Sequence, residues 1–307
     1  MQTLAFPELT SDTLAVIAQR HGLAGVVCAR LPQIGVINAI YALGDEHILR
    51  VPRDHPGTLA QFRNEIVAAP HARAAGVRTP RLVAHGAADA LLPRPYTLYE
   101  RVQGRTLGLL EWEPEALAPI WRELGHDLAL LHAAPPLEGL RPGGPGEDPR
   151  ILAEARATDG WFTGLEVRWL TRWLDRLAPA LAAPIAPVPV HLDVQAANIM
   201  VAEDSLEYRA LLDWGCAGQG DPAWDFFGLP LRAVPFVLEG HRAVAPLPED
   251  EGAEARILWR HLRIALAMLP RGAAPGMSWG ERSLAWLLEI FRFFADDPGP
   301  RWRDLRP

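Results

Sequence analysis

The chain has 307 residues, of which 49% are hydrophobic and 22% are charged, and its formal net charge is −7. This length favours two lobes over a single core, and the acidic balance argues against nucleic acid as the main partner, because phosphates attract basic residues. No apolar run is long enough to span a bilayer, the N-terminus has no secretory signal, and the only cysteines are Cys28 and Cys216. We therefore expect a cytoplasmic globular protein with no membrane association and no disulfide framework.

Lysine is absent from the sequence, so that all 30 basic residues other than histidine are arginines. A P-loop of the G-x-x-x-x-G-K-[ST] type is therefore excluded, and so is a Schiff-base lysine. Any role that a lysine would fill must fall to an arginine.

The first hundred residues have the pattern of a small sheet with one long helix. A short helix is expected first, because Ser11 and Asp12 can cap it and Gly22 can end it. Three strands follow, then a longer helix that contains Pro70, then two further strands that lead to Gly104. In chain order, these elements are expected at residues 11–21, 24–31, 36–43, 47–52, 59–75, 81–86 and 96–102.

Beyond Gly104 the hydrophobic pattern is mainly helical. Helices are expected at residues 114–134, 166–181, 252–270 and 278–295, with short strands inside 188–213. The order of the elements predicts an α+β protein with two lobes. Residues 1–102 would form a small β-rich lobe, and residues 103–307 a larger, mostly helical lobe.

Three polar residues interrupt the apolar segment VHLDVQAANIMV at residues 190–201, namely His191, Asp193 and Asn198. A second apolar strand downstream ends in Asp213, the first residue of the string D-W-G. Taken alone, Asp193 is typical of a turn cap. The offsets of the four residues, however, match the catalytic loop H-R-D-x-x-x-x-N and the metal-binding string D-F-G of protein kinases. A carboxylate can accept the proton of an attacking hydroxyl group, and carboxylate and amide oxygens are ligands for Mg²⁺.

Together with the string G-D-P-A-x-D at residues 220–225, these motifs resemble the aminoglycoside phosphotransferase family, which is also similar to choline kinases. The resemblance implies a protein-kinase-like bilobal fold. It also implies transfer of the γ-phosphate of ATP to a hydroxyl group of a small molecule, with Mg²⁺ as cofactor; GTP is not excluded as donor. Asp193 and His191 would be the catalytic residues of the loop, and Asn198 and Asp213 would be the metal ligands.

The resemblance extends to the small lobe. Arg50 in HILRVP matches the residue that holds the phosphates, and Glu65, fifteen residues later, matches its acidic partner on the following helix. The main chain at Glu100 and Val102 would hydrogen-bond adenine, and amides near Gly35 would cover the phosphates. Read without the resemblance, Arg50 and Glu65 are also compatible with solvent-exposed charges on a strand and a helix.

Three positions depart from the family pattern. Leu192 stands where the family usually has glycine, and Gln195 stands where a histidine is often present. The loop around Gly35 has a single glycine, in place of G-x-G-x-x-G. These differences put the tightness of triphosphate binding in question, whereas the base and metal positions are all retained.

The sequence leaves the acceptor and the oligomeric state undetermined. An acidic pocket would suit a cationic amine, and four carboxylates of the large lobe are candidates for it: Asp225, Glu281, Asp296 and Asp297. Asp225 is also expected to tie the catalytic loop down. Trp279 and Trp286 are candidate pocket walls, although tryptophans more often lie in cores.

Two other functions stay open. A protein kinase is one, but no A-P-E string follows D-W-G. A nucleotide-binding regulatory module without catalysis is the other. Turnover with nucleotide and acceptor molecules distinguishes these classes.

Overall fold

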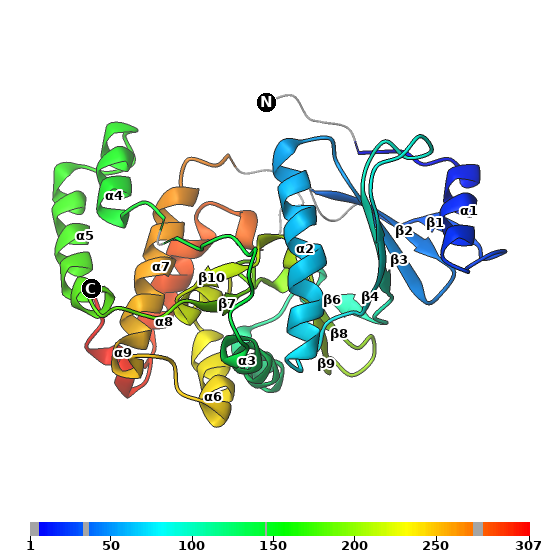
Figure 1. Cartoon of the computed structure of the whole chain (residues 1–307). Coiled ribbons are helices and arrows are strands. Elements are labelled where there is room, and N and C mark those ends of the chain that lie inside the picture. The colour runs from blue at the N-terminus through cyan, green and yellow to red at the C-terminus, as the bar shows by residue number, and fades with distance from the viewer. Residues whose placement is uncertain (1–5, 33–36, 145, 273–278) are drawn as a thin grey trace.

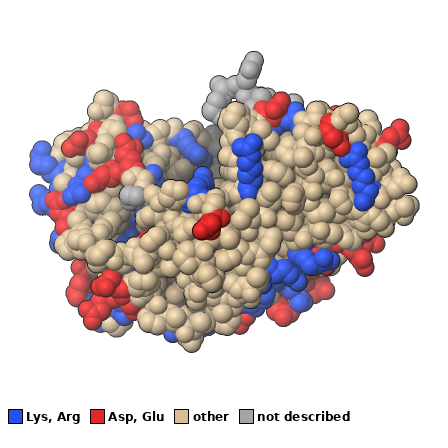
Figure 2. Space-filling view, viewed as in Figure 1, with Lys and Arg blue, Asp and Glu red and all other residues tan. Residues whose placement is uncertain are grey.

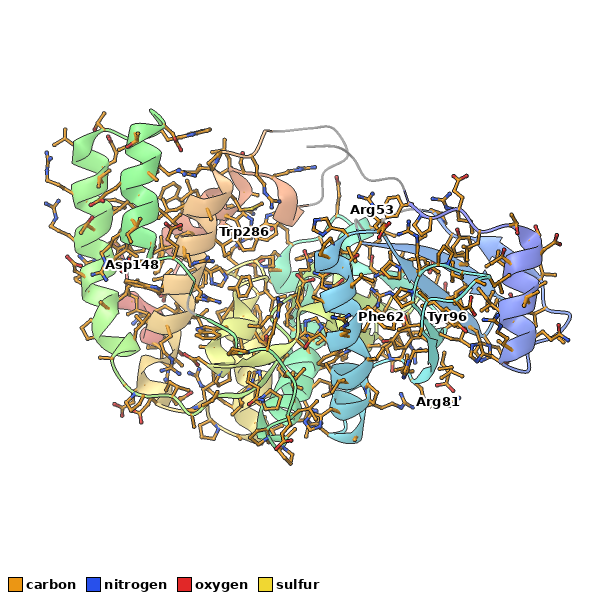
Figure 3. All side chains as sticks on the ribbon, turned by 45° about the horizontal axis from the view of Figure 1, so that its top comes forward. Arg53, Phe62, Arg81, Tyr96, Asp148 and Trp286 are labelled. Atoms are coloured by element: carbon orange, nitrogen blue, oxygen red, sulfur yellow. The ribbon has the colours of Figure 1, made fainter. Side chains whose placement is uncertain are left out.

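The computed structural model describes residues 6–32, 37–144, 146–272 and 279–307. It places a sheet-rich small lobe, which carries the N-terminal third of the chain, beside a larger helical lobe (Figure 1). Figure 3 marks Phe62 and Tyr96 in the small lobe, and Asp148 and Trp286 in the large one. The α+β arrangement expected from the sequence is confirmed.

Five antiparallel strands form the sheet of the small lobe, in the order β1-β2-β3-β5-β4. In the pairing of β3 with its two neighbours, Arg50 lies opposite Ile40 on one side and Thr97 on the other. Arg50 therefore projects from the central strand. Strands β1 to β5 span Cys28–Arg30, Asn38–Leu43, His47–Pro52, Leu82–Gly86 and Tyr96–Glu100.

Two helices accompany this sheet, α1 (Ser11–Arg20) and α2 (Pro56–Ala74). Helix α1 is capped by Thr10, whose side chain accepts a hydrogen bond from the Thr13 amide, and not by Ser11 as expected. Helix α2 begins three residues before the expected start, because a proline fits the first turn and the His55 side chain accepts a hydrogen bond from the Gly57 amide. Pro70 lies inside α2 without ending it.

The large lobe is built around a helical core. Helices α3 and α6 pack main chain against main chain: a Cβ added to Gly125 would lie 2.0 Å from the Val237 carbonyl oxygen, and one added to Gly240 would lie 2.0 Å from that of Arg122. Helices α4, α6 and α9 were not among the expected elements. Helices α3 to α9 span Ala118–Ala133, Pro149–Thr158, Gly164–Leu177, Val234–Val244, Ala253–Met268, Ala285–Ala295 and Pro300–Arg303.

Two small sheets of the large lobe lie in the middle of the molecule, on the side toward helix α2 (Figure 1). One has the order β6-β8-β9, and the other pairs β10 with β7. Their turns and ends carry the segments 191–198 and 212–217, which contain the sequence motifs. Strands β6 to β10 span Arg105–Thr106, Val188–Val190, Ile199–Val201, Tyr208–Leu211 and Gly218–Gly220.

Acidic and basic side chains are interspersed over the face of the molecule seen in Figure 2. In the described part of the chain, no helix is both long enough and apolar enough to cross a membrane.

Candidate active site

Strand β7 leads directly into the loop that carries His191, Asp193 and Asn198. The His191 ring is fully buried, and both of its nitrogens contact main-chain groups. Nε2 donates to the carbonyl oxygen of Leu212 over 2.9 Å, and Nδ1 accepts from the amide of Asp193 over 3.2 Å. Burial lowers the pKa of His191. A neutral ring therefore braces the loop from below and does not face a space that a substrate could occupy.

Asp193 is a half-buried carboxylate at the centre of this loop. The side-chain amide of Asn198 donates to its Oδ2 over 3.0 Å, and Nε2 of Gln195 donates to its Oδ1 over 2.9 Å. Burial, together with the negative charge of Asp213, raises the pKa of Asp193 to about 7. A carboxylate with a pKa near neutral is suited to accept a proton from a hydroxyl group.

Asp213 follows strand β9 and adopts a left-handed conformation with φ of 65°. The next residues form the 3-10 helix η5 (Trp214–Cys216), in which the buried Trp214 donates from Nε1 to Oγ1 of Thr79 over 2.8 Å. Asn64 on helix α2 donates its amide to main-chain carbonyl groups of this turn, including that of Gly215 at 3.2 Å. The turn after Asp213 is therefore fixed by residues of the small lobe.

Arg50 joins the two lobes through a pair of carboxylates. Its Nη1 donates to Oε1 of Glu65, and its Nη2 donates to Oδ2 of Asp213 over 2.9 Å. The Arg50 and Glu65 side chains are 13% and 5% exposed, and that of Asp213 is 35% exposed. Tyr99 adds a hydrogen bond from its hydroxyl group to Glu65 over 3.0 Å. The sequence spacing of Arg50 and Glu65 thus corresponds to a buried ion pair, and not to two solvent-exposed charges.

The predicted base and metal ligands lie in one site. The amide of Leu212, directly before Asp213, donates to the carbonyl oxygen of Asn198 over 2.8 Å. His191 bonds the carbonyl oxygen of the same leucine. These contacts hold the two motifs side by side, and they explain why the charge of Asp213 acts on Asp193.

The oxygens of this site form a suitable donor set for a magnesium ion. Within the described residues, neither Oδ1 of Asp213 nor Oδ1 of Asn198 accepts a hydrogen bond from the protein. In the same ranges, no group of three or more His, Cys, Asp and Glu side chains is placed to hold a metal. The residues therefore fit an ion that shares its coordination with phosphate oxygens and water, as Mg²⁺ does.

The segment between the lobes follows strand β5. The amide of Glu100 donates to the carbonyl oxygen of Arg81 over 2.9 Å, and Val102 lies in the extended segment beyond the strand. Gly104 then crosses strand β8 so closely that an added Cβ would lie 2.0 Å from the carbonyl oxygen of Val201. Gly35, expected near the phosphates, lies outside the described residues.

Comparisons with known proteins identify the family of the chain. A family model described as the phosphotransferase enzyme family, APH, matches residues 29–237. The chain belongs to this phosphotransferase family. No curated protein matches the chain by sequence.

Solved structures of similar fold cover almost the whole phosphotransferase. A GDP complex of wild-type aminoglycoside 2'-phosphotransferase-IIIa is 17% identical with a TM-score of 0.67, covering 92% of this chain and 98% of that one. A choline/ethanolamine kinase family protein from Mesorhizobium loti is 18% identical with a TM-score of 0.60, covering 96% of both chains. Spectinomycin phosphotransferase APH(9)-Ia, in complex with ADP and spectinomycin, is 11% identical with a TM-score of 0.56, covering 96% of both chains. The expected protein-kinase-like bilobal fold is confirmed.

Asp225 braces the loop of residues 191–198 of the phosphotransferase from within the core. It is 1% exposed, and its carboxylate accepts hydrogen bonds from the amides of His191 and Leu192 at 2.9 and 2.7 Å and from Nε2 of His132 at 2.9 Å. Burial alone would raise the pKa of Asp225, but the contact with His132 holds it below its usual range. The loop-tying role expected from the sequence matches this geometry, whereas a role for Asp225 in an acceptor pocket is wrong, because the carboxylate has no access to a ligand.

The bracing network also supports a strained residue. Leu192, which replaces the usual glycine, has a φ of 62°, a conformation that leucine rarely adopts. The two oxygens of Asp225 fix the main chain directly before this strain, at the amides of His191 and Leu192. The hydrogen-bond network continues from His132 to His241, because Nδ1 of His132 lies 3.0 Å from Nε2 of His241. Sequence reasoning missed both histidines, since only the fold brings helices α3 and α6 together.

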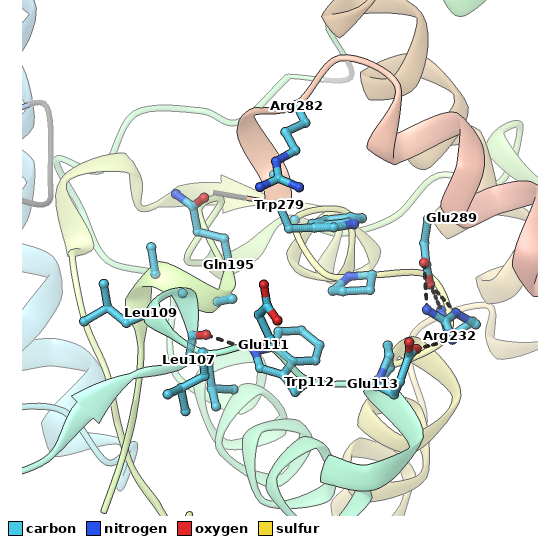
Figure 4. A pocket seen from close by; sticks show the side chains of 18 of the residues that line it. Leu107, Leu109, Glu111, Trp112, Glu113, Gln195, Arg232, Trp279, Arg282 and Glu289 are labelled. Atoms are coloured by element: carbon cyan, nitrogen blue, oxygen red, sulfur yellow. Dashed lines mark hydrogen bonds and ion pairs between the residues drawn. The ribbon is translucent and has the colours of Figure 1, made fainter. Parts of the chain in front are cut away.

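A cavity of about 310 Å³ adjoins the catalytic loop of the phosphotransferase. Gln195 lines it and donates a hydrogen bond to Asp193, so the side chain of Gln195 lies between the cavity and the predicted base. Trp279 lines the cavity as expected (Figure 4). Trp286 packs against Trp279, with 4.7 Å between ring centroids. Of the four acidic candidates for an acceptor pocket, Asp225 is buried, Asp296 and Asp297 are not among the residues that line this cavity, and the side chain of Glu281 lies outside the described part.

Proposed function

We propose that this phosphotransferase transfers the γ-phosphoryl group of ATP, or of GTP, to a hydroxyl group of a small molecule, with Mg²⁺ as cofactor. The observation that carries the proposal is the contact of Arg50 with Asp213 across the lobes, beside Asp193 and Asn198. It places a cation, two candidate metal ligands and a candidate base next to one another.

Each side chain has a role that its chemistry supports. Arg50, oriented by Glu65, binds the phosphate oxygens, because the planar guanidinium matches them with two donors. Oδ1 of Asn198 and the carboxylate of Asp213 would hold Mg²⁺, which would neutralise charge on the triphosphate. Asp193 orients the acceptor hydroxyl and takes its proton while the new P–O bond forms and the bond to the leaving nucleoside diphosphate breaks. His191 keeps Asp193 in place.

The nucleotide base would lie against the main chain at Glu100 and Val102, where the small lobe of residues 1–102 meets the large lobe of residues 103–307. Amides near Gly35 would cover the phosphates. The acceptor would enter through the cavity beside Gln195. Both cysteines are unpaired, which fits a reducing compartment such as the cytoplasm.

The test is turnover by the purified protein with Mg-ATP or Mg-GTP and a panel of hydroxylated acceptors, measured as nucleoside diphosphate release and as phosphate covalently bound to the acceptor. Acceptor-dependent release supports the proposal. A nucleotide-dependent rise in melting temperature without release from any acceptor would identify a regulatory binding module. Phosphate transfer to polypeptides alone would identify a protein kinase.

A further inference from the structure

The cavity beside Asp193 carries a balanced set of charges. Its walls include three carboxylates and three guanidinium groups, those of Glu111, Glu113, Glu289, Arg232, Arg282 and Arg292. Residues 273–278, which precede Trp279 and lie outside the described part, contain no charged side chain in the sequence. The described charges of the cavity therefore cancel.

Two of the three carboxylates are already neutralised by arginines. Arg232, 11% exposed, donates from Nη1 to Glu113 over 2.8 Å and from Nε to Glu289 over 3.0 Å. Arg292 adds a second donor to Glu113 over 3.0 Å. An incoming cation would have to displace Arg232 to use Glu289, which is 4% exposed, and this would leave a buried charge unpaired. The charge of Glu113 is already shared by two guanidinium groups.

Glu111 is different. Among the described residues, its carboxylate has no hydrogen-bond or ion-pair partner, and it points into the cavity on the side of Trp279 (Figure 4). The carboxylate of Glu111 is therefore available to pair with a positively charged ligand in the cavity.

Two tryptophans supply flat walls. The indole of Trp279 rests on Trp286, which is 5% exposed and donates from Nε1 to the Gly280 carbonyl oxygen over 3.0 Å. Trp112 rests on Trp121 and donates from Nε1 to the Leu107 carbonyl oxygen over 2.9 Å. Because the Trp112 indole N–H is already bonded and both rings are supported from behind, these walls offer fixed aromatic surfaces against which a ring can stack.

We infer that the acceptor is a single hydroxylated ring with one positive charge, which stacks on Trp279 and pairs with Glu111. The inference rests on the proposed function for its chemistry and adds the class of acceptor. The cavity volume lies near the lower end of the range of about 300–1,000 Å³ for small-molecule sites, which fits one ring. A polycationic acceptor is disfavoured, because only one carboxylate is free to meet its several ammonium groups.

The test uses four probes that share hydroxylated rings: methyl β-D-glucopyranoside without charge, D-glucosamine with one ammonium group, and neamine and kanamycin with several. Binding is measured by calorimetry in the presence of Mg²⁺ and a non-hydrolysable ATP analogue, and turnover by ADP release. We expect glucosamine to bind more tightly than the other three. Glu111→Gln should weaken glucosamine binding about tenfold and leave the neutral glycoside unaffected, and Trp279→Leu should weaken both.

Glu138→Gln is the matched control, since Glu138 is exposed and does not line the cavity; it should change neither affinity. Tighter binding of neamine or kanamycin than of glucosamine overturns the inference, as does failure of all ring probes to bind, or an unchanged preference for glucosamine in Glu111→Gln. Glu111-dependent glucosamine binding without ADP release would contradict the phosphotransfer and support the inference. Faster turnover of neamine or kanamycin than of glucosamine would support the phosphotransfer and contradict the inference about the acceptor.

Discussion

Nη2 of Arg50 in the small lobe donates a hydrogen bond to Oδ2 of Asp213 in the large lobe over 2.9 Å. The same guanidinium neutralises Glu65, which is almost completely buried. One side chain therefore links the central strand of the sheet, helix α2 and the end of strand β9. Within the described residues, Oδ1 of Asp213 accepts no hydrogen bond, so the contact between the lobes leaves the proposed metal ligand accessible.

Removing the guanidinium should destabilise the protein. Arg50→Met leaves the carboxylate of Glu65 buried and unpaired, and we expect a loss of about 3–5 kcal/mol in the free energy of unfolding. Urea denaturation measures the loss, and Glu65→Gln in the same background should recover part of it. Arg303→Met removes an exposed ion pair with Asp297 and serves as control, with almost no expected change. Equal losses in the two single variants would contradict the buried pair.

Asp193→Ala should separate binding from chemistry. Nucleotide affinity should persist, because Arg50, Asn198 and Asp213 are retained, while kcat falls by about 10²–10⁴ through loss of the base. Nucleotide-dependent melting shifts and ADP release measure the two effects. Asp204→Ala changes an exposed aspartate of the turn between β8 and β9 and should leave both unchanged. Near-normal turnover in Asp193→Ala would refute the assignment.

The stability of the metal-free protein should depend on the charge of Asp193. Its pKa is raised by burial and by Asp213 to about 7 in the folded state, against about 3.9 in an unfolded chain. Between these values the folded state binds the extra proton, so the contribution to stability decreases as pH rises from about 4 to 7. The melting temperature of Asp193→Asn relative to the wild type should therefore increase over this range in EDTA, and a difference that is independent of pH would contradict the prediction.

Asp225→Asn should loosen the catalytic loop. The amide of the new side chain cannot accept all three hydrogen bonds that Asp225 receives, so at least one buried donor loses its partner. We expect faster hydrogen exchange at the amides of His191 and Leu192, and a lower kcat. Asp148→Asn removes the ion pair with Arg150 at the start of helix α4 in the same lobe and should leave exchange at Leu192 unchanged. Unchanged exchange in Asp225→Asn would show that the strained leucine is held by other contacts.

Residues that act through fixed local spacing could be predicted from the sequence. His191, Asp193 and Asn198 lie within one short loop, and Arg50 and Glu65 are separated by one turn and part of a helix. Their spacing in the sequence therefore limits how far apart they can lie in the fold. The contacts of His132 with His241, and of Arg232 with Glu113, join residues more than a hundred positions apart. No local pattern reports such pairs, so the sequence could not show that Glu113 and Glu289 are neutralised by arginines.

The central cation of the cleft is a guanidinium in a chain without lysine. Acetylation, carbamylation and amine-directed acyl phosphate labels act on lysine side chains and have no such target here. The ion pair of Arg50 with Glu65 and Asp213 is thus chemically inert to the reagents that commonly inactivate nucleotide sites through an ε-amino group, and covalent probes for this cleft must be directed at other groups.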